Sequence, residues 1–247
     1  KKSERSSGRK LFSSLSAAEI ASKSYQSDSR LLAIWSAFEG LLPTPPENAK
    51  SRISHFEGLI TPCVAIDYIP RMFSDFKHDC QILNKRELSE FICTNYGSDD
   101  DLSAFIKVFY DEEEKKRKFC ELISGSRLLL SRAMELNKIA NSPKALHHTY
   151  TSHVRRVRWQ INRIYRERNA IVHKASSTRV SHNLSEHAYS YFRSVILALE
   201  SVYRKYEVVH TEASFDLIKY LFESQRKKLI ELSSNISDEN DSRNGRD

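Results

Sequence analysis

Glycine and proline are scarce in this chain, with only 6 of each among its 247 residues. Large β-sandwiches and barrels need many tight turns, and such turns depend on these two residue types. Apolar residues make up 40% of the chain, which is enough for a substantial core. In several stretches they recur at positions i, i+3, i+4 and i+7, and no convincing run of alternating strand residues interrupts them. The sequence therefore predicts an all-α protein.

Breaks in the apolar pattern divide the predicted helices. The first clear stripe occupies Leu31 to Leu42 and ends at Pro43, because proline lacks the amide that would continue a helix. Upstream of it, Ser16 and Glu19 have the spacing of a capping box, which predicts a helix start there. Further helices are predicted over residues 47–69, 86–95, 102–110, 112–139 with a weak point at Gly125, 143–172, 184–202 and 215–232.

The two ends of the chain differ from its middle in composition. Residues 1–12 are basic and polar, which predicts a tail or linker, and residues 233–247 are rich in Ser, Asn and Asp, which predicts a disordered tail. The predicted helical domain covers residues 13–232. The chain does not begin with methionine, so one interpretation is that it forms the C-terminal part of a longer protein, with a sensor domain before it.

Several features of the sequence argue against a membrane or secreted protein. No stretch approaches the roughly 18 apolar residues of a membrane span, and the polar N-terminus is not a secretory signal. The cysteines have long, irregular spacings without a C-x-x-C pair, which argues against zinc and favours reduced thiols; they are Cys63, Cys80, Cys93 and Cys120. We therefore expect a cytoplasmic protein with no cofactor and no bound metal.

Positive charge is concentrated in one segment. The formal net charge is +7, and six arginines fall within the 14 residues from position 155 to position 168. A basic run of this kind on a helix can bind the backbone of a polyanion such as RNA. The candidates for such contacts are Arg155, Arg158 and Arg166. The alternative interpretation is a solvated helix face without a ligand.

Three polar residues end the predicted helix over residues 143–172. On a helical wheel Arg168 lies about 20° from Ile161, the centre of the apolar stripe, so its guanidinium should enter a helix interface. A charge there needs a paired carboxylate or an anionic ligand. Asn169 and His173 are four residues apart and share one border of the stripe. The alternative is a structural ion pair at Arg168 and an ordinary helix-end histidine.

The segment Ile164 to His173, which contains Arg168-Asn169 and ends in His173, resembles the signature of the HEPN superfamily of helical ribonucleases. That signature is R-x4–6-H, often with a polar residue directly after Arg. The segment from Arg30 to Leu42, with Trp35 and Glu39, resembles the first core helix of Apea-like HEPN domains. One departure is Lys174, where a glycine often follows the histidine.

The resemblance implies a HEPN-type helical bundle with a helical insertion between the second and third core helices. The core would cover residues 28–69 and 143–206, and the insertion residues 70–142. It also implies metal-independent cleavage of RNA, in which the 2′-hydroxyl attacks the phosphate and leaves a 2′,3′-cyclic phosphate. In this scheme His173 transfers protons near neutral pH, Arg168 stabilises the phosphate charge, and Asn169 orients the substrate.

Two further residues are candidates for support. Glu39 is expected to hold Arg168 across a helix pair, with a solvated surface carboxylate as the alternative. Tyr165 lies one turn before Asn169 and is a candidate to stack or hydrogen bond near the site, with core packing as the favoured alternative.

The motif supplies one histidine per chain, so the resemblance implies a homodimer with a composite active site. It also suggests a toxic effector of prokaryotic phage defence or of a toxin–antitoxin system, with an antitoxin as partner. A partner that modifies a tyrosine near the motif is less favoured, because Ala175 occupies the expected position. The alternative function is a non-catalytic helical module that binds RNA or mediates dimerisation.

Overall fold

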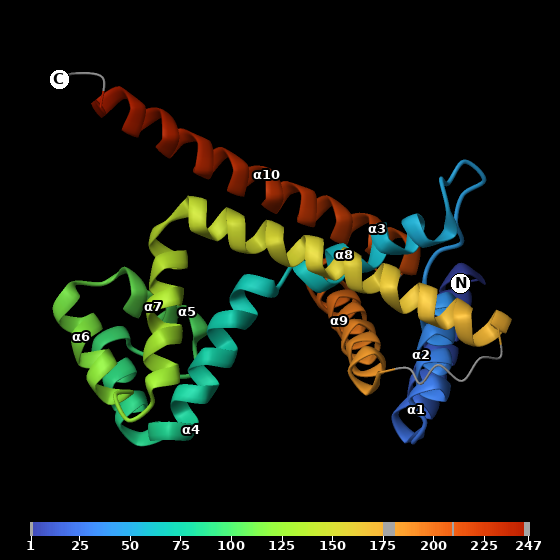
Figure 1. The fold of residues 1–247 in the computed structure, drawn as a ribbon, viewed down its shortest axis with the longest axis horizontal. Coiled ribbons are helices and arrows are strands. Elements are labelled where there is room, and N and C mark those ends of the chain that lie inside the picture. The colour runs from blue at the N-terminus through green and yellow to red at the C-terminus, as the bar shows by residue number, and fades with distance from the viewer. Residues whose placement is uncertain (1, 175–180, 209, 245–247) are drawn as a thin grey trace. The chain divides into compact units, whose positions relative to one another are not determined.

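The structure is a computed structural model that describes residues 2–174, 181–208 and 210–244. Within these ranges it consists of ten α-helices and one short 3-10 helix, and none of the described residues forms a strand (Figure 1). The prediction of an all-α protein is therefore confirmed.

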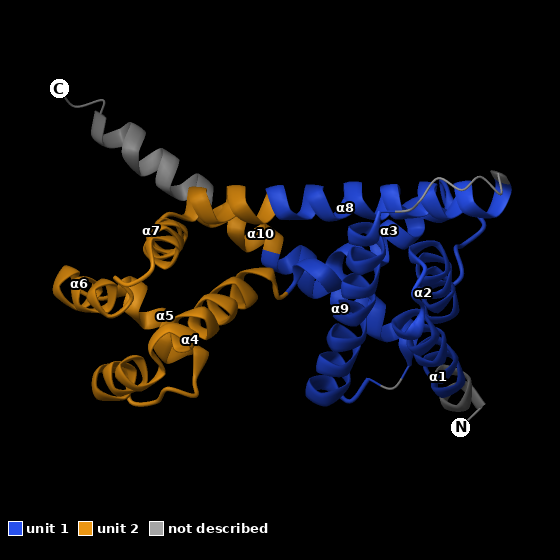
Figure 2. Ribbon diagram, turned by 60° about the horizontal axis from the view of Figure 1, so that its bottom comes forward, with its two compact units in different colours: residues 1–66, 152–225 blue, residues 67–151, 226–247 orange. Residues whose placement is uncertain are grey.

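The chain divides into two compact units, which Figure 2 colours separately. Unit 1 comprises residues 1–66 and 152–225, and unit 2 comprises residues 67–151 and 226–247. Helices α8 (Pro143–Lys174) and α10 (Thr211–Asn244) contribute residues to both units. The other helices of unit 1 are α1 (Lys2–Lys23), α2 (Ser27–Leu41), α3 (Arg52–Ala65) and α9 (His182–Tyr206). Those of unit 2 are α4 (Tyr68–Tyr96), α5 (Leu102–Lys107), η1 (Val108–Tyr110), α6 (Glu113–Leu122) and α7 (Arg127–Asn141).

The core of unit 1 is built around α2. Its predicted apolar stripe is buried as a whole, against α1 and α9. Trp35 is 1% exposed, and its ring packs against Phe56 of α3 and Tyr165 of α8, with ring centroids 6.0 and 5.4 Å away. From α8, the buried members of the same core are Val157, Ile161 and Ile164. One aromatic side chain thus joins three helices that are far apart in the sequence.

Helix α1 corrects two predictions for the N-terminal region. It begins at Lys2, so residues 2–12 are helical and do not form the predicted tail or linker, and the predicted capping box lies inside the helix. Its residues Ser14, Ala18 and Ala21 are buried against the rest of unit 1. A Cβ atom at Gly40 of α2 would lie 3.0 Å from the Ser14 hydroxyl oxygen, so the glycine permits this close packing. The buried side of α1 is thus made of small residues, so its sequence lacks the stripe of large apolar residues that marks a helix face.

The predicted disordered tail also differs from the structure, because α10 continues to Asn244. Residues 233–244 contain neither glycine nor proline, and adding a residue to an existing helix requires no new nucleation.

Helix α4 begins at Tyr68, well before the predicted start at residue 86. It is kinked at Asn84, whose φ of −152° and ψ of 75° are not helical. The predicted breaks at Pro43 and around Gly125 are confirmed.

Residues 67–151 of unit 2 separate the two stretches of unit 1 in the sequence. These limits lie close to those of the predicted insertion, residues 70–142. The HEPN-type arrangement of the core and the insertion itself stay predictions. Unit 2 has its own core, in which Phe76, Phe105, Phe109 and Phe119 surround one another with ring centroids 5.9 to 6.3 Å apart.

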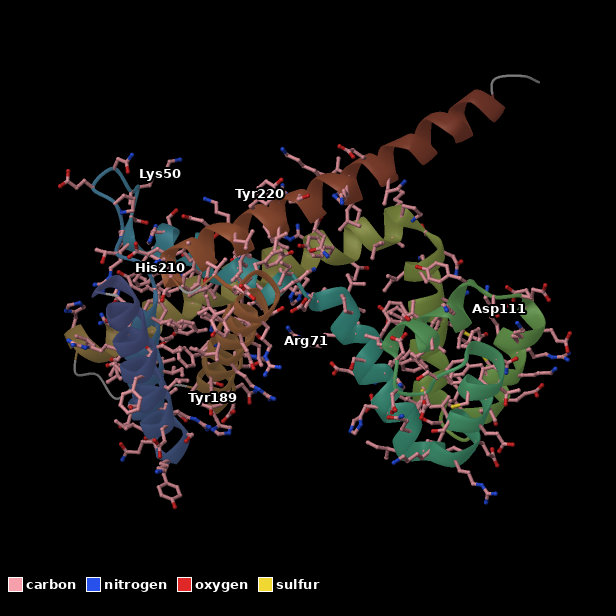
Figure 3. The ribbon with its side chains drawn as sticks, turned by 180° about the vertical axis from the view of Figure 1, so that it is seen from behind. Lys50, Arg71, Asp111, Tyr189, His210 and Tyr220 are labelled. Atoms are coloured by element: carbon pink, nitrogen blue, oxygen red, sulfur yellow. The ribbon has the colours of Figure 1, made fainter. Side chains whose placement is uncertain are left out.

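A polar joint connects three elements of unit 2 at Asp111, which is labelled in Figure 3. The carboxylate accepts hydrogen bonds from the backbone N–H of Glu112 at 2.7 Å, from Tyr96 Oη at 2.9 Å and from Lys115 Nζ at 3.0 Å. These bonds lower the pKa of Asp111 to about 2, with the Glu112 amide as the largest cause. Burial and the same hydrogen bond raise the pKa of Tyr96.

We expect Asp111→Asn to weaken the acid sensitivity of unit 2. The folded-state pKa lies below the ordinary value of 3.8, so the carboxylate stabilises the fold above about pH 4 and loses this effect as the pH falls towards 2. The variant should be less stable at neutral pH, and its stability should fall less between pH 4 and pH 2 than that of the wild type. Urea unfolding at several pH values measures this. Asp100→Asn, at an exposed position, is the control; parallel pH profiles for Asp111→Asn and the wild type would contradict the expectation.

Candidate functional site

Helix α8 carries the predicted site on the end that belongs to unit 1. Val157, Ile161 and Ile164 form its buried face, and Arg168 continues the same line one turn later. The Arg168 side chain is only 23% exposed. The Arg168 guanidinium therefore lies between helices, as the sequence predicted.

The Glu39 carboxylate of α2 is the centre of the contacts around Arg168. Its Oε1 atom accepts a hydrogen bond from Trp35 Nε1 at 2.9 Å. The same oxygen lies 3.2 Å from Nη2 of Arg52 and 3.5 Å from Nη2 of Arg168. Glu39 itself is 20% exposed, so it is not the solvated surface carboxylate of the alternative interpretation. The expected contact between Glu39 and Arg168 is present, and the buried indole fixes the carboxylate that makes it.

Arg52, in the first turn of α3, was missed by the sequence analysis. Its guanidinium lies over the Phe56 ring at 5.4 Å and beside Glu39, and the side chain is 53% exposed. No local sequence signal marks it, because its role depends on how α3 packs beside α2. Two guanidinium groups therefore share one carboxylate. The cluster of Glu39, Arg52 and Arg168 carries a net charge of about +1, which favours an anionic ligand.

Asn169 contacts the guanidinium that precedes it. Arg168 Nη1 donates a hydrogen bond to Asn169 Oδ1 at 3.0 Å. This bond occupies the amide oxygen, and within the described ranges the structure gives the amide nitrogen no partner. The nitrogen can therefore donate to a ligand oxygen. Arg168 and Asn169 together present donors suited to a phosphate group.

His173 lies apart from these two residues. It is exposed and comes one residue before the end of α8. Five residues along a helix correspond to a rotation of about 140° and a rise of about 7.5 Å, so His173 and Arg168 point in different directions. Among the described residues the structure gives no contact between His173 and either Arg168 or Asn169. The sequence analysis expected Arg168, Asn169 and His173 to lie together. Within the described part of one chain, only Arg168 and Asn169 contact each other.

Tyr165 packs as a core residue. Its half-buried ring lies against Trp35 at 5.4 Å and a tilt of 51°, which fits the core-packing alternative. A supporting role beside the site stays a prediction. The ring thus contacts the same indole whose N–H group binds Glu39.

The predicted RNA-binding arginines fall into two groups. Arg158 Nε lies 3.4 Å from Oε1 of Glu57 on α3, and the same carboxylate accepts a hydrogen bond from Asn162 Nδ2 at 2.7 Å. This contact ties α8 to α3 and offsets the charge of Arg158. Arg155 and Arg166 are exposed, and within the described part of the chain the structure gives neither a salt bridge. These two charges remain available to a polyanion.

Other site classes find no support in the described ranges. They contain no group of three or more His, Cys, Asp or Glu side chains arranged to hold a metal ion. The four cysteines are free thiols, of which Cys63 and Cys80 are buried. Of the described helices, none combines the length and apolar character needed to cross a bilayer.

Comparison with known proteins finds no family model, no curated protein sequence and no solved structure that matches the chain. The arguments for a function therefore rest on the residues and their geometry.

Proposed function

We propose that this chain is a metal-independent endoribonuclease of the HEPN type. The observation that carries the proposal is the cluster in which Glu39 contacts both Arg52 and Arg168. A single carboxylate cannot neutralise two guanidinium groups, and Arg168 has the longest of the three contacts to it. The remaining N–H groups of Arg168 are thus held in place by packing but are not saturated, as a preorganised phosphate site requires.

The chemistry uses groups that RNA and this chain supply. The 2′-oxygen of a ribose bonds to the adjacent phosphorus, and the bond from phosphorus to the 5′-oxygen breaks. The products are a 2′,3′-cyclic phosphate and a 5′-hydroxyl. The 2′-hydroxyl must lose a proton and the leaving 5′-oxygen must gain one. His173 takes the first proton and returns it to the 5′-oxygen, Arg168 stabilises the charge on the phosphate oxygens, and Asn169 orients them through its amide nitrogen.

The separation of His173 from Arg168 favours a composite site in a homodimer. Arg168 and Asn169 of one chain would bind the phosphate, and His173 of a second chain would approach it. This arrangement places one histidine beside each bound phosphate, and a two-fold dimer then contains two such sites. A toxic effector of phage defence or of a toxin–antitoxin system is the cellular role that suits such an enzyme.

The same separation supports a second candidate function. A chain with an anion-binding arginine cluster but no proton-transfer group beside it can serve as a non-catalytic RNA-binding or dimerisation module. The two candidates differ in one respect that can be measured directly, namely whether bound RNA is cleaved.

The test is incubation of the purified chain with RNA in EDTA, followed by analysis of the product ends. We expect cleavage with 2′,3′-cyclic phosphate ends, and Arg168→Ala should slow it about 10²–10³-fold, as loss of one donor to a developing oxyanion does. Arg204→Ala on α9 removes an exposed arginine of the same unit and should have no effect. Equal rates for Arg168→Ala and the wild type would overturn the site assignment. RNA binding without cleavage would favour the second candidate.

A further inference from the structure

The solvent-facing side of α8 carries an exposed tryptophan among arginines. Trp159 is 56% exposed, whereas tryptophan side chains are mostly buried in folded proteins. On the helix it lies opposite Arg168, about 180° away, so it faces outward from the core of unit 1. Nothing in the packing of that core requires an indole at this position. The exposed ring is therefore accessible to a ligand.

The neighbours of Trp159 on this face are basic. Arg155 and Arg166 precede and follow it at spacings of four and seven residues, which place them within about 40° of Trp159 on the helix surface. Arg163, one turn after Trp159, lies over its ring with the guanidinium carbon 5.7 Å from the ring centroid. This contact restrains the indole. His173 lies on the same face, about 21 Å along the helix axis from Trp159.

These charges are not neutralised by the protein where the structure describes it. Arg158, on the flank of α8, is paired with Glu57. For Arg155, Arg163 and Arg166 the described residues supply no acidic partner. Glu167 is the single acidic residue in the sequence of α8. The exposed face is thus a strip of positive charge interrupted by one aromatic ring and ending at His173.

We propose that this strip binds single-stranded RNA, with a base stacked on Trp159 and the following phosphates on Arg166 towards His173. The inference rests on the proposed function, because it names the form of RNA that the ribonuclease would bind. In a duplex the bases are already stacked inside the helix and cannot reach an indole, whereas unpaired bases stack readily on exposed aromatic side chains. The rise of α8 between Trp159 and His173 leaves room for several nucleotides.

An anionic membrane fits this face less well. A helix that lies on a bilayer presents a broad apolar face, with charges on the other side. On α8 the other large exposed apolar residue, Val172, lies about 140° away from Trp159. A single indole among guanidinium groups matches alternating bases and phosphates instead.

The test measures binding separately from cleavage, in the His173→Ala background. The chain has two tryptophans, and because Trp35 is buried, quenching of fluorescence by a ligand reports mainly on Trp159. We expect single-stranded oligouridylate to quench this emission and duplex RNA of equal length to bind more weakly. The affinities of the Trp159 variants, which lack this reporter, are measured by the fluorescence anisotropy of an end-labelled oligonucleotide. Trp159→Ala should lower the affinity for the single strand about 5- to 150-fold, and Trp159→Phe should retain most of it. Arg166→Ala should reduce the salt dependence of binding.

The matched control is Tyr220→Ala on α10, which removes an exposed aromatic ring of the same unit (Figure 3). Unchanged affinity in Trp159→Ala would overturn the stacking proposal, and so would equal binding of duplex RNA or a preference for phosphatidylserine vesicles. If Trp159 contributes to binding but the wild type never cleaves RNA, the ribonuclease proposal fails and the binding strip stands. If the wild type cleaves RNA and Trp159→Ala binds normally, the reverse holds.

Discussion

Mixing His173→Ala chains with Arg168→Ala chains is expected to restore about a quarter of the wild-type RNA cleavage, although each variant alone is nearly inactive. The expectation follows from the separation of the two side chains on α8. If Arg168 of one chain works with His173 of its partner, half of the dimers in the mixture combine one chain of each kind. Each of these mixed dimers holds one intact site, whereas a wild-type dimer holds two. Each variant alone should lose about 10²–10⁴-fold in rate, the usual contribution of a proton-transfer group or a charge-stabilising donor.

The experiment needs both variants in one dimer population. Co-expression with two different tags and sequential purification isolates mixed dimers, whose cleavage rate should be about half that of the wild type. The control combines Arg168→Ala chains with chains that carry both substitutions, because these dimers contain no intact site of either arrangement. Purified mixed dimers that remain inactive would mean that the site lies within one chain, and would leave the distance between His173 and Arg168 unexplained.

Trp35→Ala is expected to destabilise unit 1 by about 3–5 kcal/mol, the cost of truncating a buried large aromatic residue. The indole is 1% exposed and packs against Phe38, Phe56 and Tyr165. Its loss leaves a cavity where three helices meet and also removes the hydrogen bond that orients Glu39. Because a small domain is stable by only about 5–15 kcal/mol, the variant should lose a large part of its margin.

Trp159→Ala is the matched control, since it makes the same substitution on an exposed side chain. It should change the stability by less than about 0.5 kcal/mol. Thermal and urea unfolding, followed by far-ultraviolet circular dichroism, measure both variants without relying on tryptophan emission. Equal stability of the two variants would show that the indole of Trp35 does not hold the three helices together. Trp35→Phe, which keeps most of the packing but removes the N–H group, should show an intermediate loss.

The helices with strong local signals were predicted well from the sequence. The apolar stripe of α2, its end at Pro43 and the start of α8 at Pro143 all agree with the structure. The contact of Glu39 with Arg168 was also expected, because both residues lie on apolar faces that had to meet. The first half of α1 and the end of α10 were missed, since the first packs through small residues and the second continues a helix already formed.

The sequence by itself determined the class of fold and the place of the charged residues along each helix, because both depend on spacing over a few turns. It placed Arg168 on the buried side of α8. Only the tertiary structure decided that Arg52 joins Glu39 and that the cluster around this carboxylate holds two positive charges against one negative. The reason is physical, because such a contact depends on how three helices pack, and no local pattern within any one of them encodes that packing.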